Sequence, residues 1–347
     1  MKLGIRLAWA ALGLAATLSV TGCGDVEERA QVPRVTLVLG AYTTPREAYG
    51  EGIIPAFQEY WKTRTGQDVV FRESYQGSGA QARAIVGGFE ADVAALSLEA
   101  DVDKLTEAGL ITHDWRAKPH GGMITNSIAV MAVRAGNPKG IRDWADLARP
   151  GVEVLTPDPQ TSGGAQWNVA ALYGAALRGH AGVPADNPQA AFGVLQDVLR
   201  NVRIMDKGAR ESITNFERGV GDVAITYENE VQVAQEAGED YEYVVPTSTI
   251  LIENPVAVVD VYADRHGVRE VADAFVDFLW RQESQRAFAE NGYRPVDPTV
   301  AREFASRFPE VQDLWGIDAL GGWTQVRAEI FGPRGIFTRA FQELHGS

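Results

Sequence analysis

The sequence has very few of the residues from which disulfides, metal sites and common active sites are built. Cys23 is the only cysteine among the 347 residues, so no disulfide within the chain can support the fold. None of the five histidines lies four residues from another, and the chain has no CxxC, HExxH or GxSxG pattern. We therefore predict no metal ion and no catalytic residue. Scattered carboxylates could still form the acid pair of a hydrolase, which stays an alternative.

Cations are also scarce. The chain carries 32 Lys and Arg residues against 46 Asp and Glu residues, which gives a formal net charge of −14. This acidity disfavours nucleic acid and anionic membrane surfaces as partners. It also opposes the long-range attraction of a small anion. An anion site in this chain would therefore have to act at short range, through backbone dipoles and hydrogen bonds.

The beginning of the sequence is typical of an export signal. Residues 1–22 contain two cations, no acid and an apolar run over residues 7–20 that is too short for an ordinary transmembrane span. The small residues directly before Cys23 resemble the lipobox of a bacterial lipoprotein. The polar stretch 23–33 resembles a tether. We expect lipidation at Cys23, so that acyl chains hold the protein at a membrane.

Short apolar runs then alternate with helical patterns. Strands are expected at 35–39, 68–74 and 92–96, with helices at 45–65 and 101–108. This alternation is typical of an open, mostly parallel sheet with helices on both faces. An α/β fold is therefore predicted.

Two long apolar runs, each of which we expect to form a strand, divide the chain further. They cover residues 127–134 and 255–262, and a second α/β set lies between them. This pattern predicts that the chain crosses into a second lobe and returns, with a hinge at the crossing. We expect lobe I to comprise residues 34–126 and 257–347, and lobe II to comprise residues 127–256.

Three turns lead from a predicted strand into a predicted helix through small residues. They are Gly77-Ser78-Gly79, Thr161-Ser162-Gly163-Gly164 and Lys207-Gly208-Ala209-Arg210. The first N–H groups of a helix have no partner within the helix and carry a partial positive charge, and small residues let a ligand approach them. Together the turns predict a pocket that holds a small anion with neutral donors. The first turn also matches the dinucleotide pattern G-x-G-x-x-A, but a tight turn is the plainer explanation, and no cofactor is predicted.

These turns belong to a set of landmarks through which the chain resembles the sulfate-binding proteins of bacterial ABC importers. The resemblance extends from Val35 to Thr338. Its landmarks, in order, are Tyr42–Tyr49, Lys62–Val69, Gly77–Gln81, Glu90–Val93, Gly136–Lys139, Asp158–Asn168, Gly208–Arg210, Tyr227–Glu230, Tyr293–Pro295 and Gly321–Thr324. The number and order of these motifs make the resemblance specific.

The resemblance implies a type II periplasmic binding fold with two lobes, each a mixed, mostly parallel sheet flanked by helices, and one dehydrated sulfate in the cleft. The ligand-binding residues transferred by motif are Thr43, Ser78, Ser162, Gly163, Gly164, Ala209 and Tyr227. Backbone N–H groups serve as donors, and Ser162 and Tyr227 add side-chain donors. The implied protein is a monomer without enzymatic activity that delivers sulfate to an ABC permease. It is lipid-anchored, in the periplasm or at the outer face of the cytoplasmic membrane.

Some positions depart from the family pattern. Thr43 stands where Asp is common, and Asp158, Gln160 and Gln166 replace Asn, Lys and Arg. Tyr227 stands where the better-known sulfate binders have Trp; an indole N–H only donates, whereas a phenol also accepts. Thiosulfate, molybdate and other tetrahedral oxyanions are therefore alternative ligands. An exported hydrolase and a purely structural envelope lipoprotein are the alternative classes of protein.

Overall fold

The computed structural model describes residues 34–346. The predicted signal segment, the tether and Cys23 lie outside these residues. The strands in this part of the chain are β1 Arg34–Tyr42, β2 Asp68–Gln76, β3 Val93–Ala95, β4 Met123–Arg134, β5 Val154–Pro157, β6 Val202–Asp206, β7 Val223–Tyr227, β8 Tyr241–Val244, β9 Ser248–Val258, β10 Arg294–Pro295 and β11 Asp313–Trp315. Its α-helices are α1 Ile54–Thr65, α2 Ser78–Val86, α3 Glu99–Glu107, α4 Gly163–Leu177, α5 Pro188–Arg200, α6 Ala209–Glu217, α7 Glu228–Glu236, α8 Asp260–His266, α9 Arg269–Phe278, α10 Gln282–Glu290, α11 Pro298–Glu303, α12 Gly322–Glu329 and α13 Ile336–His345. None of the helices within residues 34–346 has both the length and the apolar composition needed to cross a bilayer.

Parallel pairing dominates each end of the sheet. At one end, β1 pairs in parallel with β2 along its whole length and with β3 near its carboxyl end. At the other end, β5 pairs in parallel with both β6 and β7. The order along the sheet is β2-β1-β3-β9-β4-β7-β5-β6, with β8, β10 and β11 beside this path. The predicted α/β architecture is confirmed.

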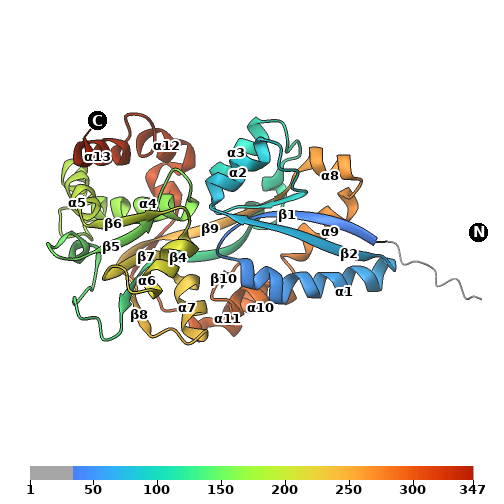
Figure 1. The fold of residues 1–347 in the computed structure, drawn as a ribbon, viewed down its shortest axis with the longest axis horizontal. Coiled ribbons are helices and arrows are strands. Elements are labelled where there is room, and N and C mark those ends of the chain that lie inside the picture. Colours follow the sequence, from blue (N-terminus) through green and yellow to red (C-terminus); the bar gives the residue numbers. More distant parts are fainter. Residues whose placement is uncertain (1–33, 347) are drawn as a thin grey trace, which may run out of the picture. The chain divides into compact units, whose positions relative to one another are not determined.

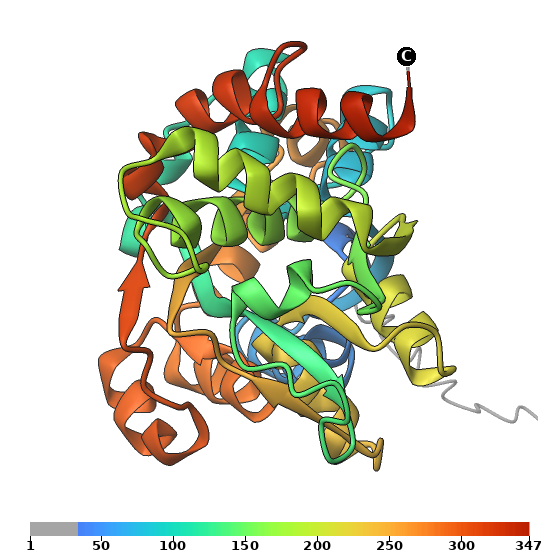
Figure 2. The same cartoon turned by 90° about the vertical axis from the view of Figure 1, so that its left-hand side faces the viewer.

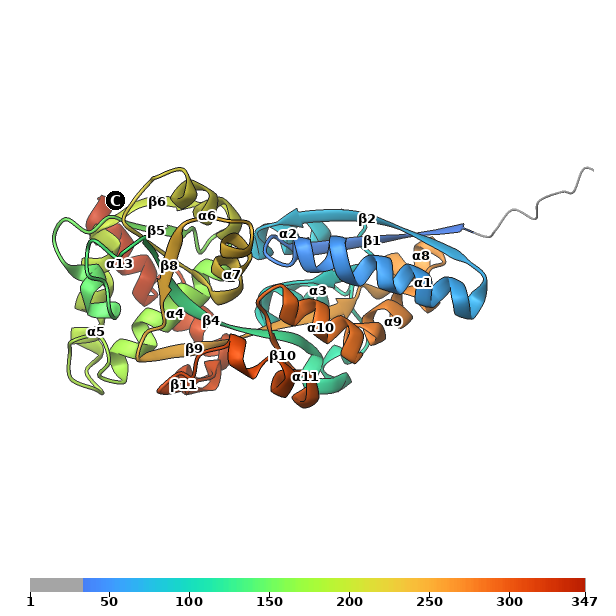
Figure 3. The same cartoon turned by 90° about the horizontal axis from the view of Figure 1, so that it is seen from below.

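Two long antiparallel strands, β4 and β9, join the two ends. β4 pairs with β9 over residues 123–128 and with β7 over residues 129–133, while β9 continues to β3 over residues 256–258. Each of these strands therefore belongs to both halves of the sheet. Figure 3 shows them passing between two separate groups of helices. They form the crossing that the two apolar runs predict.

The second apolar run is not a single strand. We predict a strand over residues 255–262, but β9 ends at Val258 and α8 begins at Asp260. The Asp260 carboxylate accepts hydrogen bonds from the backbone N–H groups of Thr112 and His113, and an acidic residue suits the first turn of a helix. These hydrogen bonds of Asp260 end the strand before the apolar run itself ends.

Helices cover both faces of each half of the sheet, as Figure 1 shows. In the first half, α1 and α9 pack on one face and α2 and α3 on the other. In the second half, α4 and α5 pack opposite α6 and α7. Buried residues contributed by these helices, in the same order, are Phe57, Phe275, Ile85, Val102, Trp167, Leu195, Phe216 and Val231. We refer to the two halves as lobe I and lobe II.

The end of the chain packs on lobe II. β11 pairs in parallel with β9 at Ser248–Ile250, and Trp315 and Phe337 are buried in the core that α4 and α5 cover. Figure 2 shows α13 lying along α5. We predict from the sequence that all of 257–347 belongs to lobe I. Because the apolar faces of β11, α12 and α13 pack elsewhere, we propose that residues 313–346 belong to lobe II; the other lobe boundaries stay predictions.

Candidate functional site

The predicted ligand-binding residues lie at the carboxyl ends of parallel strands. Thr43 follows β1, Ser78 follows β2 and Ala209 follows β6. Ser162 lies in the loop after β5, and Tyr227 is the last residue of β7. In open α/β sheets this is the edge at which ligands bind. The topology therefore gathers residues from distant parts of the sequence at one edge of each lobe's sheet.

Three helices begin at this edge, as the sequence predicts. Gly77, Ser162 and Gly208 are the N-cap residues of α2, α4 and α6. The Ser162 hydroxyl oxygen accepts a hydrogen bond from the backbone N–H of Ala165 at 3.3 Å, which leaves the hydroxyl proton for another acceptor. The first N–H groups of each helix have no partner within the helix and carry a partial positive charge. Each helix start therefore supplies neutral donors.

The turns of the two lobes touch each other. The backbone N–H of Ala80 in lobe I donates to the carbonyl oxygen of Thr161 in lobe II at 3.1 Å. The Thr161 hydroxyl in turn donates to the Lys207 carbonyl oxygen at 2.9 Å. A Cβ atom on Gly77 would lie 2.6 Å from both of these carbonyl oxygens, which is closer than real Cβ atoms approach. The lobes can therefore meet at this distance only because residue 77 is glycine.

The predicted residues form one connected cluster. A Cβ atom on Gly164 would lie 2.7 Å from Cε2 of Tyr227 and 3.4 Å from Cβ of Ala209. A Cβ atom on Gly208 would lie 3.6 Å from the Thr43 hydroxyl oxygen. All seven predicted residues are buried, namely Thr43, Ser78, Ser162, Gly163, Gly164, Ala209 and Tyr227. The structure brings them together, and their role as ligand-binding residues stays a prediction.

Ser97 is not among the predicted residues, yet it joins the two lobes within this cluster. Its hydroxyl oxygen lies 2.6 Å from the Tyr227 hydroxyl oxygen. Its backbone N–H donates to the Ser78 hydroxyl oxygen at 2.9 Å, and Ser78 donates to the buried Asp101 carboxylate at 2.6 Å. Burial raises the pKa of Tyr227 well above its usual value, so the phenol keeps its proton. Ser97 lies just beyond the carboxyl end of β3, so its place at a strand end is a signal that could have identified it.

Arg210 follows Ala209 directly, but its guanidinium group is paired with two carboxylates. Its Nε atom donates to Glu230 at 2.7 Å, and its Nη1 and Nη2 atoms donate to Glu47 at 2.7 and 2.9 Å. The Glu230 side chain is fully buried. The charges of Glu230 and Glu47 raise the pKa of Arg210 further, so the guanidinium stays charged and paired. Arg210 therefore ties lobe II to Glu47 of lobe I and is not a free cation for an anionic ligand.

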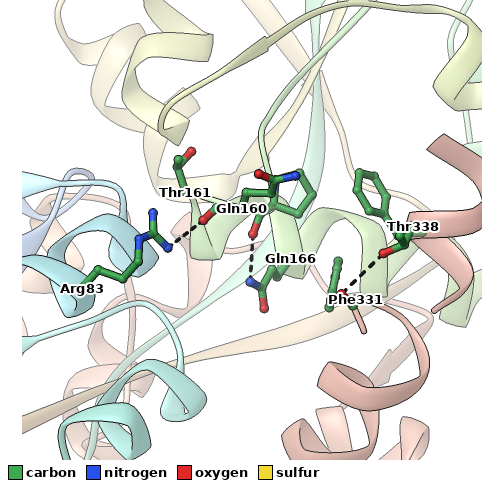
Figure 4. Close-up of a pocket in the computed structure, with 8 residues that line it drawn as sticks. Arg83, Gln160, Thr161, Gln166, Phe331 and Thr338 are labelled. Carbon is green, nitrogen blue, oxygen red and sulfur yellow. Dashed lines mark hydrogen bonds between the residues drawn. The ribbon is translucent and has the colours of Figure 1, made fainter. Parts of the chain in front are cut away.

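A surface pocket of about 570 Å³ lies beside the contact between the lobes. Arg83 of α2 reaches across and donates to the Gln160 carbonyl oxygen at 2.9 Å, as Figure 4 shows. Gln166 and Phe331 form other parts of the wall. The lining residues come from lobe I, lobe II and the C-terminal segment, so the form of this pocket depends on the lobes being together.

The arrangement suits a small anion that carries no proton. The predicted donors are backbone N–H groups at three helix starts, a serine hydroxyl and a neutral phenol, and helix dipoles add local positive potential. Within residues 34–346, no group of three or more His, Cys, Asp or Glu side chains is arranged to hold a metal ion. Neutral donors of this kind bind a ligand and do not by themselves make or break its bonds.

Comparison with known proteins identifies the family. Residues 37–294 match the family model described as bacterial extracellular solute-binding protein. A sulfate-binding protein of Synechococcus elongatus is 42% identical to this chain over 344 residues, which cover 97% of this chain and 96% of the relative. This chain belongs to the sulfate-binding family of bacterial solute-binding proteins.

Two further comparisons place the chain within this solute-binding family. The solved structure of the sulfate-binding protein SubI from Mycobacterium tuberculosis has a TM-score of 0.78 and 39% sequence identity, with 86% of this chain and 99% of that chain covered. A thiosulfate-binding protein of Pseudomonas aeruginosa is 34% identical over 307 residues, which cover 87% of this chain and 90% of the relative. The predicted two-lobed type II binding-protein fold is thereby confirmed.

Proposed function

We propose that this solute-binding protein captures sulfate between its lobes, outside the cytoplasmic membrane, and delivers it to the permease of an ABC importer. The observation that carries the proposal is the convergence of the seven predicted donor residues, from both lobes, in one buried cluster. The sulfate-binding relatives support the same ligand. The pairing of Arg210 with two carboxylates supports recognition by uncharged donors.

Sulfate fits this donor set because it has no proton at neutral pH. Each of its oxygens can accept hydrogen bonds from N–H and O–H groups. Monohydrogen phosphate would instead place its P–OH group against a donor. A buried hydrogen bond that is left unmade costs about 1–3 kcal/mol. We therefore expect a preference for sulfate over phosphate of about tenfold to hundredfold.

Titration calorimetry is expected to show sulfate binding to a single site, because both lobes contribute to one cluster. The heat should persist in a large excess of phosphate. Sulfate should also raise the melting temperature of the protein, because a ligand that binds only the folded state stabilises it. Sodium chloride at the same ionic strength is the control. No sulfate binding in either measurement would overturn the proposed function.

Thiosulfate is a second candidate ligand. The thiosulfate-binding relative supports it, and the Tyr227 phenol can accept as well as donate a hydrogen bond. One terminal atom of thiosulfate is sulfur, which is a weaker hydrogen-bond acceptor than oxygen. Competition between sulfate and thiosulfate in the same calorimeter decides between them. Displacement of sulfate by an equal concentration of thiosulfate would favour the second candidate.

Replacing Ser162 by alanine is expected to weaken sulfate binding by about 1.5–3 kcal/mol, because one hydroxyl donor to a charged ligand is lost. The same change removes the N-cap of α4 and costs about 1 kcal/mol of folding free energy. Asn187→Ala is the matched control, since Asn187 caps α5 in the same way. The control should lose stability but not affinity. An unchanged sulfate affinity in Ser162→Ala, measured by calorimetry, would place Ser162 outside the binding site.

The remaining features of the proposal concern the setting of the protein. We propose that it acts as a monomer without enzymatic activity and is held at the membrane by lipid on Cys23. The supporting observation is the small-residue sequence before Cys23 together with the preceding apolar run. Metabolic labelling with a fatty acid, compared between wild type and Cys23→Ser, tests the anchor.

A further inference from the structure

We propose that Ser97 determines the specificity of the site by donating a hydrogen bond to the Tyr227 phenol oxygen, so that Ser97 occupies the acceptor position of that oxygen and the phenol offers its own proton to the ligand. This inference rests on the proposed function, because it concerns the same site. It follows from the contact between Ser97 and Tyr227, which come from opposite lobes and are each 1% exposed.

The backbone of Ser97 is held in place by hydrogen bonds from several elements. Its carbonyl oxygen accepts from Nε1 of Trp167 in α4 at 3.0 Å and from Nδ2 of Asn254 in β9 at 3.1 Å. Its N–H donates to the hydroxyl oxygen of Ser78 at 2.9 Å. The Ser97 side chain is therefore presented to Tyr227 from a fixed position.

The hydroxyl pair lies against the start of α4, where two predicted donors are found. A Cβ atom on Gly163 would lie 2.8 Å from the Ser97 hydroxyl oxygen, and one on Gly164 would lie 2.7 Å from the Tyr227 ring. The pair is thus a neighbour of the N–H groups predicted to hold the anion. A change in the hydrogen bonding between Ser97 and Tyr227 would therefore change which hydrogen-bonding groups face the ligand.

Counting protons shows what the pair can offer. Two hydroxyls carry two protons, and the 2.6 Å contact between Ser97 and Tyr227 uses one of them. The other proton remains for the ligand, on Tyr227 if Ser97 donates and on Ser97 if Tyr227 donates. An anion beside Tyr227 favours the orientation in which Ser97 donates and the phenol proton faces the anion. In that orientation the Tyr227 oxygen accepts from Ser97 and donates to the ligand, whereas a phenol without Ser97 could also accept from the ligand.

Replacing Ser97 by alanine is expected to lower the ratio of sulfate affinity to phosphate affinity by about tenfold. Without Ser97, the phenol oxygen of Tyr227 becomes free to accept a hydrogen bond from the P–OH group of monohydrogen phosphate. Calorimetric titrations with sulfate and with inorganic phosphate measure the ratio. Ser284→Ala is the control, because Ser284 is equally buried and its hydroxyl donates to a carbonyl oxygen elsewhere, in lobe I. The control should leave the ratio unchanged.

Tyr227→Phe shows whether Ser97 acts through the phenol. In this background the oxygen that could accept from phosphate is missing, so adding Ser97→Ala should lower both affinities without changing their ratio further. An unchanged ratio in Ser97→Ala would overturn the inference, and so would an equal fall in the ratio with and without the phenol. Urea unfolding verifies that each variant is folded. The proposed function fails separately, if the wild-type protein binds no sulfate.

Discussion

Replacing Gly77 by alanine is expected to weaken sulfate binding by about tenfold to hundredfold. A Cβ atom at this position would lie 2.6 Å from the carbonyl oxygens of Thr161 and Lys207. Both are backbone atoms, so neither can move aside as a flexible side chain would. The lobes must then stay farther apart at this point, and donors from opposite lobes no longer reach one anion together. Calorimetry with sulfate measures the loss of affinity.

The same substitution should leave the free energy of unfolding nearly unchanged in the absence of ligand. The backbone of Gly77 is extended, with φ −54° and ψ 137°, and alanine adopts this conformation without strain. Gly316→Ala is the matched control, because Gly316 also precedes a helical turn with extended backbone and has no atom within 4 Å of the added Cβ. If Gly77→Ala binds sulfate as tightly as this control, the contact between the lobes is not part of the bound state.

Replacing Arg210 by glutamine is expected to destabilise the protein by about 3–5 kcal/mol. The side chain of Glu230 is fully buried, and Arg210 is the cation that compensates its charge. Without Arg210, Glu230 must either stay ionised in a buried place or take up a proton. Glu47 is partly exposed and can turn to water. Urea unfolding measures the change in the free energy of unfolding.

The loss of stability in Arg210→Gln should depend on pH with a defined sign. Burial raises the pKa of Glu230, and without its cation the folded protein binds a proton there that the unfolded chain releases at neutral pH. Stability of the variant therefore falls as the pH rises, so the difference from wild type is smaller at about pH 5 than at about pH 8.

Arg286→Gln is the control for the Arg210 substitution. Arg286 also binds a carboxylate through two atoms, but both partners are exposed, at 41% and 39%. Exposed pairs of this kind contribute about 1 kcal/mol or less. A similar small effect for Arg210→Gln, independent of pH, would mean that Glu230 is stabilised by other groups.

The positions at the edge of the cleft were predictable because their signals are local. Gly77, Ser162 and Gly208 each mark the start of a helix through residue type alone, and the structure places an N-cap at each of them. The carboxyl ends of parallel strands then bring these starts together. Even α5, which was not predicted, begins with an Asn187 cap and Pro188, both of which are ordinary helix-start signals.

Features that depend on distant contacts could not be predicted in this way. The strand end before Ser97 marks its position, but nothing local indicates its contact with Tyr227, which is 130 positions away in the sequence. The apolar residues Trp315 and Phe337 show that the C-terminal segment has a buried face, but composition does not say which lobe that face covers. The strand predicted over 255–262 ends early because Asp260 binds backbone N–H groups of a separate loop. In each case the structural role of the residue depends on a contact with a distant part of the chain, which the local sequence does not reveal.

The two crossing strands limit how the cleft can open. Since β4 and β9 are hydrogen-bonded to each other between the lobes, with β10 paired to β4 at Thr125 and Asn126, separation of the lobes has to bend or twist this ribbon rather than slide one lobe over the other. Because the pairing register of the strands stays fixed, the two lobes return to the same relative position after each bending motion. The two walls of the cleft can therefore return to the same alignment each time the lobes close, with little search for the correct arrangement.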